Sequence, residues 1–163
     1  MTATFDLKRY QNSLEIQRAL LGAKTVAVVG LSGNSLRASN FIGFYLKRHG
    51  YDVIPVNPRE DEILGEKCYG SLLDIPVSVD IVNVFRNPEA LPGIAKDTAA
   101  IGAKALWCQF NVISEEGARI AEEGGVTVIM DRCIKVEHAR YIGRMHWLGF
   151  NTGRITSVRR GLE

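Results

Sequence analysis

The residues with the clearest chemical potential form a loop of small and polar side chains at positions 30–39. This loop follows an apolar run at 25–30 and leads into residues spaced as in a helix. Backbone N–H groups in such a loop, together with the positive end of the following helix, bind phosphate, and an arginine adds charge. The pattern predicts a phosphate site formed by Gly30, Ser32, Gly33, Asn34, Ser35, Arg37 and Ser39.

The glycine motif of this loop is incomplete, because Gly30 and Gly33 lack the full spacing of a dinucleotide fingerprint. A structural alternative is that the glycines only turn the chain between a strand and a helix.

A second polar group, Asn57, Pro58 and Arg59, follows an apolar run at 51–56. Enzymes that bind NAD place an acidic residue here to hold the adenine ribose, so asparagine and proline favour an adenine nucleotide with an extra phosphate. Arg59 is then a candidate phosphate ligand. The alternative is a solvated charge that precedes the acidic run at 60–62.

Two further groups stand where the apolar runs at 79–85 and 103–107 end: Phe85, Arg86 and Asn87, and then Trp107 and Gln109. Carboxyl ends of parallel strands share one edge of a sheet, so we expect these side chains to converge on the same ligand. An aromatic ring there can stack on adenine or line an apolar channel. Taken singly, Phe85 and Trp107 also fit ordinary core positions.

The sequence indicates little catalytic chemistry. Cys133 stands beside Arg132 at an expected helix start, where a thiolate is conceivable, but cysteine is often buried and His138 is not four residues away. Common hydrolase, zinc-protease and nucleotide-triphosphate motifs are absent from the sequence, and the three histidines show no metal-ligand grouping. We therefore expect a binding protein, with no catalytic or metal site. The alternative is an NAD(P)-type nucleotide-binding enzyme or a thiol-dependent enzyme using Cys133.

The elements that must position these residues alternate along the chain. Apolar runs at 25–30, 51–56, 79–85, 103–107 and 126–130 predict strands, separated by helical patterns. Continuous apolar runs are typical of parallel strands covered on both faces. The sequence therefore predicts an α/β, Rossmann-like, doubly wound, mostly parallel five-stranded sheet with helices on both faces.

Several finer expectations concern single elements. Pro55 indicates that the second strand lies near an edge of the sheet or has a bulge there, and Ser114 is expected to cap a helix. A leading helix is expected at 12–21, and others at 39–49 and 88–101. A last helix at 133–143 is expected to carry Val136, Ala139 and either Tyr141 or Ile142 toward the sheet.

Length and composition predict one domain at 1–149 and a basic tail at 150–163. No apolar segment is long enough to span a membrane, and the net charge of +2 is too small to indicate nucleic-acid binding. Residues 132–163 carry seven basic and two acidic side chains, which could serve a phosphate, a partner subunit or solvation. Three scattered cysteines and an N-terminus unlike an export signal predict a cytoplasmic location.

The ordered motifs at 28–32, 53–58, 64–66, 71–76, 79–86, 107–109 and 130–138 also carry a family likeness. Over residues 13–142 the chain resembles small stand-alone CoA-binding proteins, which are related to the CoA-binding N-terminal domain of the succinyl-CoA synthetase α subunit. The resemblance implies a Rossmann-like fold that binds coenzyme A or an acyl-CoA across the strand ends. It implies a diphosphate at the first loop and adenine near Asn57 and Pro58.

By this likeness, the residues expected to bind the ligand are Gly30, Ser32, Arg37, Ser39, Asn57, Pro58, Phe85, Arg86, Trp107 and Gln109. The synthetase's phosphohistidine and second domain have no counterpart here, so the resemblance does not imply ligase activity. The basic tail, with Trp147, Arg154, Arg159 and Arg160, is expected to serve a homo-oligomer or a protein partner.

Overall fold

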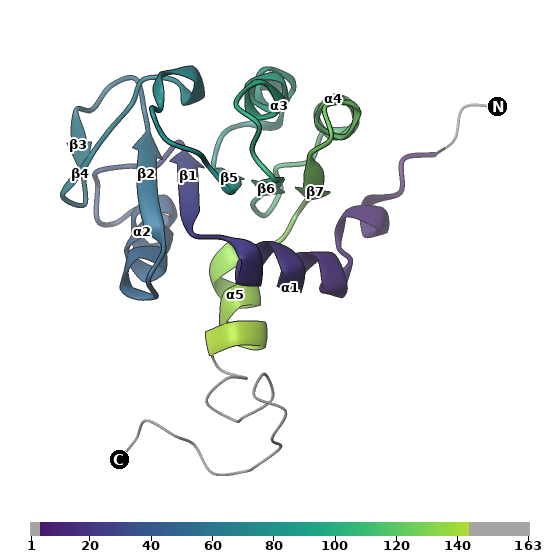
Figure 1. The fold of residues 1–163 in the computed structure, drawn as a ribbon, viewed down its shortest axis with the longest axis horizontal. Helices are drawn as coiled ribbons and strands as arrows, with labels where there is room; N and C mark the ends of the chain where they lie inside the picture. Colours follow the sequence, from purple (N-terminus) through teal and green to yellow (C-terminus); the bar gives the residue numbers. More distant parts are fainter. Residues whose placement is uncertain (1–3, 144–163) are drawn as a thin grey trace, which may run out of the picture.

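The computed structural model describes residues 4–143, which fold around a parallel five-stranded sheet (Figure 1). Its strands lie in the order β2-β1-β5-β6-β7, and all neighbours are parallel. The strands are β1 (Thr25–Val29), β2 (Asp52–Val56), β5 (Ile81–Val84), β6 (Ala105–Cys108) and β7 (Thr127–Ile129). The predicted fold class is therefore confirmed.

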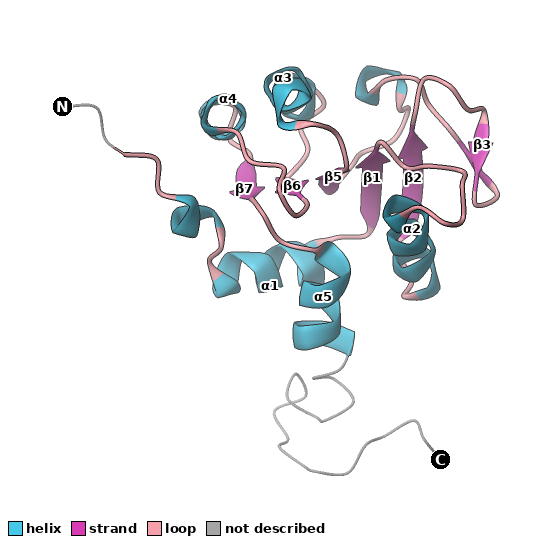
Figure 2. Cartoon of the chain, turned by 180° about the vertical axis from the view of Figure 1, so that it is seen from behind, coloured by secondary structure: helices cyan, strands magenta, loops and turns pink. Residues whose placement is uncertain are grey.

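Helices cover both faces of the sheet, as Figures 1 and 2 show. The helices α3 (Leu91–Ala100) and α4 (Glu115–Glu123) pack on one face. The helices α1 (Ser13–Gly22), α2 (Ala38–Arg48) and α5 (Ile134–His138) pack on the other. The chain also forms three short 3-10 turns and one π-helical turn: Leu7–Tyr10, Leu72–Asp74 and Pro88–Ala90, and then Ala139–Gly143.

The strand β1 shows why this sequence folds as a covered parallel sheet. Val26 and Val28 belong to the core under α1, α2 and α5, whereas Ala27 and Val29 belong to the core under α3 and α4. Because successive side chains of a strand point to opposite faces, a strand covered on both faces must be apolar throughout. The unbroken apolar run in the sequence is the signature of this arrangement.

Local signals set the ends of the helices. The Asn12 side chain accepts hydrogen bonds from the Leu14 and Glu15 N–H groups at the start of α1, and the Ser114 side chain accepts one from the Gly117 N–H in α4. Gly50 adopts a φ of 91° just after α2, as expected of a helix stop. These contacts confirm the predicted cap at Ser114.

The strand β2 lies at an edge of the sheet, as Pro55 predicted. A small hairpin that the sequence patterns did not predict, β3 (Glu62–Ile63) and β4 (Glu66–Lys67), follows it.

The last helix differs from the prediction. The helix α5 spans only five residues before the π-helical turn, and it buries Ile134, Glu137 and His138. Val136 is 42% exposed, so its expected packing against the sheet was wrong. Ile134, Glu137 and His138 form the buried face of α5, which leaves Val136 on the opposite face. Beyond α5 the backbone changes its hydrogen-bond period at Ala139, so the regular helical spacing does not extend to residue 143.

The predicted basic tail at 150–163 lies outside the described residues. Within residues 4–143, no helix is both long and apolar enough to cross a membrane.

Candidate functional site

The carboxyl ends of β1 and β5 flank the point where the strand order reverses. From β1 the chain passes to β2 on one side, and β5 lies on the other side (Figure 1). Ligands of open α/β sheets bind at such a switch point. The two loops that follow these strands begin at Gly30 and Phe85, and both belong to the predicted site.

These two loops touch at Gly30. This residue has a φ of 87°, and a Cβ atom added there would lie 3.0 Å from the Phe85 carbonyl oxygen and 3.2 Å from Cδ of Arg86. Only glycine meets both demands, a left-handed backbone and a close approach of the neighbouring chain. The structure therefore brings the first loop and the Phe85–Arg86 turn together.

Hydrogen bonds fold the loop at 30–39 back onto the first turn of α2. The Ser32 N–H donates to Ser39 Oγ at 3.1 Å, and the Asn34 N–H donates to Ser32 Oγ at 3.1 Å. The Asn40 side-chain amide donates to the Ser32 carbonyl at 2.8 Å. Arg37 occupies the N-cap position of α2, and its side chain accepts no hydrogen bond from the first turn of the helix. The positive end of an eleven-residue helix thus faces the loop without a cap from that side chain.

Asn57 ties the end of β2 to the same loop. Its Nδ2 donates to the Leu31 carbonyl at 3.1 Å, and its Oδ1 accepts from the Arg59 N–H at 2.9 Å. The Glu60 carboxylate also reaches across and accepts a hydrogen bond from the Gly33 N–H at 2.8 Å. Glu60 was not among the predicted site residues, because the acidic run at 60–62 carries no signal of a contact with residue 33.

A cavity of about 220 Å³ lies beside these strand ends, on the α3 side of the sheet. It brings Pro58 and Arg86 together from the predicted set. It is lined by Val29, Val56, Pro58, Gly70, Ser71, Leu72, Arg86, Ala90, Ile94 and Asp97. The wall is mostly apolar, with Arg86 and Asp97 as its charged residues, and an apolar wall beside an arginine suits a flat ring that adjoins a phosphate.

Another cavity, of about 240 Å³, lies at the opposite, amino ends of the strands. Its charged residues include Asp80 and Lys104, which form an ion pair of 3.3 Å with each other. It contains none of the predicted ligand-binding residues, so we place the candidate site at the carboxyl ends.

Three arginines around the carboxyl ends are available to an anionic ligand. Arg37, Arg59 and Arg86 are exposed. Among residues 4–143, none of the three forms a salt bridge. The exposed Asn87 follows Arg86, and the exposed Ser35 lies within the loop. The chemistry of this edge therefore fits a ligand with several phosphates.

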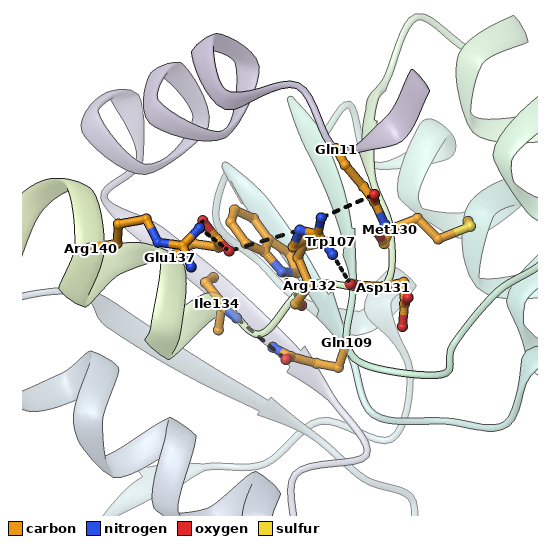
Figure 3. A network of polar contacts seen from close by, with 9 residues as sticks. All are labelled: Gln11, Trp107, Gln109, Met130, Asp131, Arg132, Ile134, Glu137 and Arg140. Atoms are coloured by element: carbon orange, nitrogen blue, oxygen red, sulfur yellow. Dashed lines mark hydrogen bonds and ion pairs between the residues drawn. The ribbon is translucent and has the colours of Figure 1, made fainter. Parts of the chain in front are cut away.

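Trp107 and Gln109 occupy a different environment. Trp107 is fully buried and donates its indole N–H to the Arg132 carbonyl at 2.8 Å. The buried Gln109 side chain hydrogen-bonds the Asn83 side chain at 2.6 Å. It also accepts from the Ile134 N–H at 3.4 Å, as Figure 3 shows. Neither side chain offers a surface for direct ligand contact in this structure. Both support the start of α5, whereas Phe85 is half-buried beside the site.

The segment at 131–138 is held by an ionic network around Glu137, shown in Figure 3. The Glu137 side chain is 3% exposed, and its oxygens lie 3.9 Å from Arg132 Nε and 3.3 Å from an Arg140 Nη atom. Arg132 also donates to Gln11 Oε1 at 3.1 Å. The network joins α5 to the N-terminal segment, which indicates a structural role.

The same segment shows no catalytic pair. Cys133 is buried, and within the described residues its sulfur makes no hydrogen bond to His138. His138 Nδ1 instead lies 2.9 Å from the Tyr45 hydroxyl. Burial, with a smaller effect of the charge of His49, lowers the pKa of His138 to about 4. Residues 4–143 also contain no group of three or more histidine, cysteine, aspartate or glutamate residues that could hold a metal ion.

Comparisons with known proteins find one matching family and several relatives. A family described as the CoA binding domain matches residues 24–139. The uncharacterized protein YneT of Bacillus subtilis is 46% identical over 125 residues, which cover 77% of this chain and 93% of YneT. The ADP-forming acetate–CoA ligase II of Archaeoglobus fulgidus is 35% identical over 117 residues, which cover 71% of this chain and only 17% of the ligase.

Solved structures show the same relationship. A hypothetical protein from Pyrococcus horikoshii superposes with a TM-score of 0.80 at 36% identity, covering 88% of this chain and all of that protein. The acetyl-coenzyme A synthetase 1 of Candidatus Korarchaeum cryptofilum gives a TM-score of 0.60 at 27% identity, covering 68% of this chain and 26% of the synthetase chain. Because the family model matches residues 24–139, the chain belongs to the CoA-binding domain family.

Proposed function

We propose that this protein binds coenzyme A or an acyl-CoA across the carboxyl ends of β1, β2 and β5, as a binding or metabolite-sensing protein. The observation that carries the proposal is the contact of the Gly30 loop with the Phe85–Arg86 turn. The exposed side chains of Arg37, Arg59 and Arg86 belong to the same strand ends, and within residues 4–143 they form no salt bridge. Coenzyme A carries a diphosphate and a ribose phosphate, so several cationic groups around one loop suit it. Membership of the family supports this ligand.

In this proposal the diphosphate lies against the loop at 30–39, near Arg37 and Arg86. The adenine ring enters the 220 Å³ cavity beside Pro58, and Arg59 holds the ribose phosphate. The backbone amides of the loop and the uncapped end of α2 supply further positive potential.

A binding role is favoured over catalysis by the burial of the reactive groups. The Cys133 thiol is buried and has no histidine partner among the described residues, which removes the support for a thiol-dependent enzyme. The ligases that match this chain are several times longer, so their reaction is not carried over. The predicted cytoplasmic location and the predicted partner role of the tail remain predictions.

Isothermal titration calorimetry tests the proposal with CoA, acetyl-CoA, NADH and NADPH. We expect heat from the CoA species, and we expect Arg86→Gln to weaken binding about tenfold, as the loss of a charge-assisted hydrogen bond does. Arg119→Gln is the matched control, because Arg119 pairs with Glu123 on the exposed side of α4. No heat from either CoA species at high micromolar concentration would end the proposal. Binding of NADPH alone would favour the dinucleotide alternative.

A further inference from the structure

The Glu60 carboxylate occupies part of the proposed phosphate loop. Its Oε2 accepts a hydrogen bond from the Gly33 N–H at 2.8 Å and a weaker one from Asn57 Nδ2 at 3.4 Å. A carboxylate oxygen resembles a phosphate oxygen in charge and in hydrogen-bonding capacity. An anionic side chain of the protein thus uses a loop amide that a ligand phosphate would need.

The glycine at position 33 fits this contact. Gly33 does not have a left-handed φ, so its backbone conformation does not call for glycine. A Cβ atom at this position would collide with the Glu60 carboxylate. The missing side chain therefore allows the carboxylate to reach the loop.

Glu60 is held there by neutral donors. Within residues 4–143 it forms no salt bridge, and its side chain is half-buried. Arg37, Arg59 and Arg86 remain exposed nearby in the same site. A phosphate that approaches the Gly33 amide must displace the carboxylate and meets its negative charge on the way.

We propose that Glu60 is a built-in competitor of the ligand phosphate, which sets the affinity of the loop for anionic ligands. This inference rests on the function proposed above for the loop. Replacement of the carboxylate by a neutral amide removes the repulsion and weakens the internal hydrogen bond. We expect Glu60→Gln to bind anions more tightly by about fivefold or more, the size of one charge-assisted contact.

Amide NMR with inorganic pyrophosphate as the probe tests this directly. The wild type, Glu60→Gln and the control Glu62→Gln are titrated while the Gly33 resonance is followed. The control variant Glu62→Gln lacks one negative charge, as Glu60→Gln does, but Glu62 lies in β3, paired with Lys67 of the hairpin. We expect tighter binding for Glu60→Gln only, with the gain shrinking in about 0.5 M salt because salt screens the repulsion. A structural effect on the loop would not show this salt dependence.

Equal or weaker binding of pyrophosphate by Glu60→Gln overturns the inference, as does a Gly33 resonance that responds in neither protein. Calorimetry with CoA separates this result from the function itself. If CoA binds the wild type and Glu60→Gln gains nothing with either ligand, the function stands and the competitor role fails. If CoA gives no heat while pyrophosphate binding tightens in Glu60→Gln, the proposed ligand fails and the competitor role stands.

Discussion

Gly30 lies so close to Phe85 that a Cβ atom on the glycine would stand 3.0 Å from the Phe85 carbonyl oxygen. We expect Gly30→Ala to lower the free energy of unfolding by about 2 kcal/mol or more, because it adds a clash to a left-handed φ. Gly102→Ala is the control, since Gly102 has a φ of 71° but no atom within 4 Å of its added Cβ. Urea denaturation measures both. Equal losses would show that the contact with Phe85 costs nothing.

Arg59 is expected to recognise the ribose phosphate of CoA. Arg59→Gln should weaken the binding of CoA by about tenfold, while the binding of dephospho-CoA, which lacks that phosphate, should not change. Calorimetry with the two ligands gives the comparison. A matching loss for both ligands would place Arg59 away from the ribose phosphate.

Because Arg132 pairs with the buried Glu137, its replacement should lower the free energy of unfolding more than the replacement of an arginine in an exposed ion pair. Arg132→Ala should cost about 2 kcal/mol, because it leaves a buried carboxylate with Arg140 as its remaining partner. Arg119→Ala removes an exposed pair with Glu123 and should cost about 0.5 kcal/mol or less. Urea denaturation of both variants measures the difference, and similar costs would contradict the structural role of the network.

Because the pKa of His138 is lowered in the folded state, we expect the protein to lose stability in mild acid. Burial lowers the pKa of His138 in the folded state to about 4, below the ordinary histidine value of 6.5. Above the unfolded pKa the imidazole is neutral in both states, so it has no effect there. As the pH falls toward 4, only the unfolded chain takes up the proton, and the free energy of unfolding drops by up to about 3 kcal/mol.

Denaturation at neutral pH and near pH 5 checks this for the wild type and for His138→Gln, which lacks the titrating group. The variant should lose less stability between the two pH values. His49→Gln removes the smaller, charge effect on His138 and leaves the burial, so its loss of stability should lie between those of the wild type and His138→Gln. An identical pH dependence of all three proteins would show that His138 is protonated in the fold.

The cysteines are expected to react slowly in the folded protein. Cys68, Cys108 and Cys133 are all buried, and burial raises the pKa of the Cys68 and Cys108 thiols. A coloured disulfide reagent should label them quickly only after urea is added. Fast labelling of Cys133 in the native protein would revive the thiol-dependent alternative.

The sheet was predictable from sequence because its strands are covered on both faces and are therefore mostly apolar, most clearly β1 with its buried residues 26–29, although β5 includes the buried Asn83. The position of the loop at 30–39 was predictable because it follows the apolar run of β1, and its binding of phosphate stays a prediction. The hairpin β3–β4 was not, since two-residue strands are too short for a periodic pattern.

Side-chain direction was the harder part of the site. Trp107 and Gln109 lie at the carboxyl end of β6 as predicted, yet their side chains turn inward to Arg132 and Asn83. Sequence position gives the edge of the sheet but not which way a side chain points. The contact of Glu60 with Gly33 spans two loops, and no local pattern encodes it.

The edge strand β2 also limits how copies of this protein can assemble. Pro55 has no N–H, and its carbonyl accepts from the Tyr69 N–H at 3.0 Å, while the Tyr69 carbonyl accepts from the Asn57 N–H at 2.9 Å. At the opposite edge, the Met130 N–H donates to the Tyr10 carbonyl at 3.0 Å. Both borders of the sheet are thus partly occupied by the protein's own chain. Growth of the sheet from one molecule into the next is disfavoured, and helices or loops are left as the surfaces for self-association.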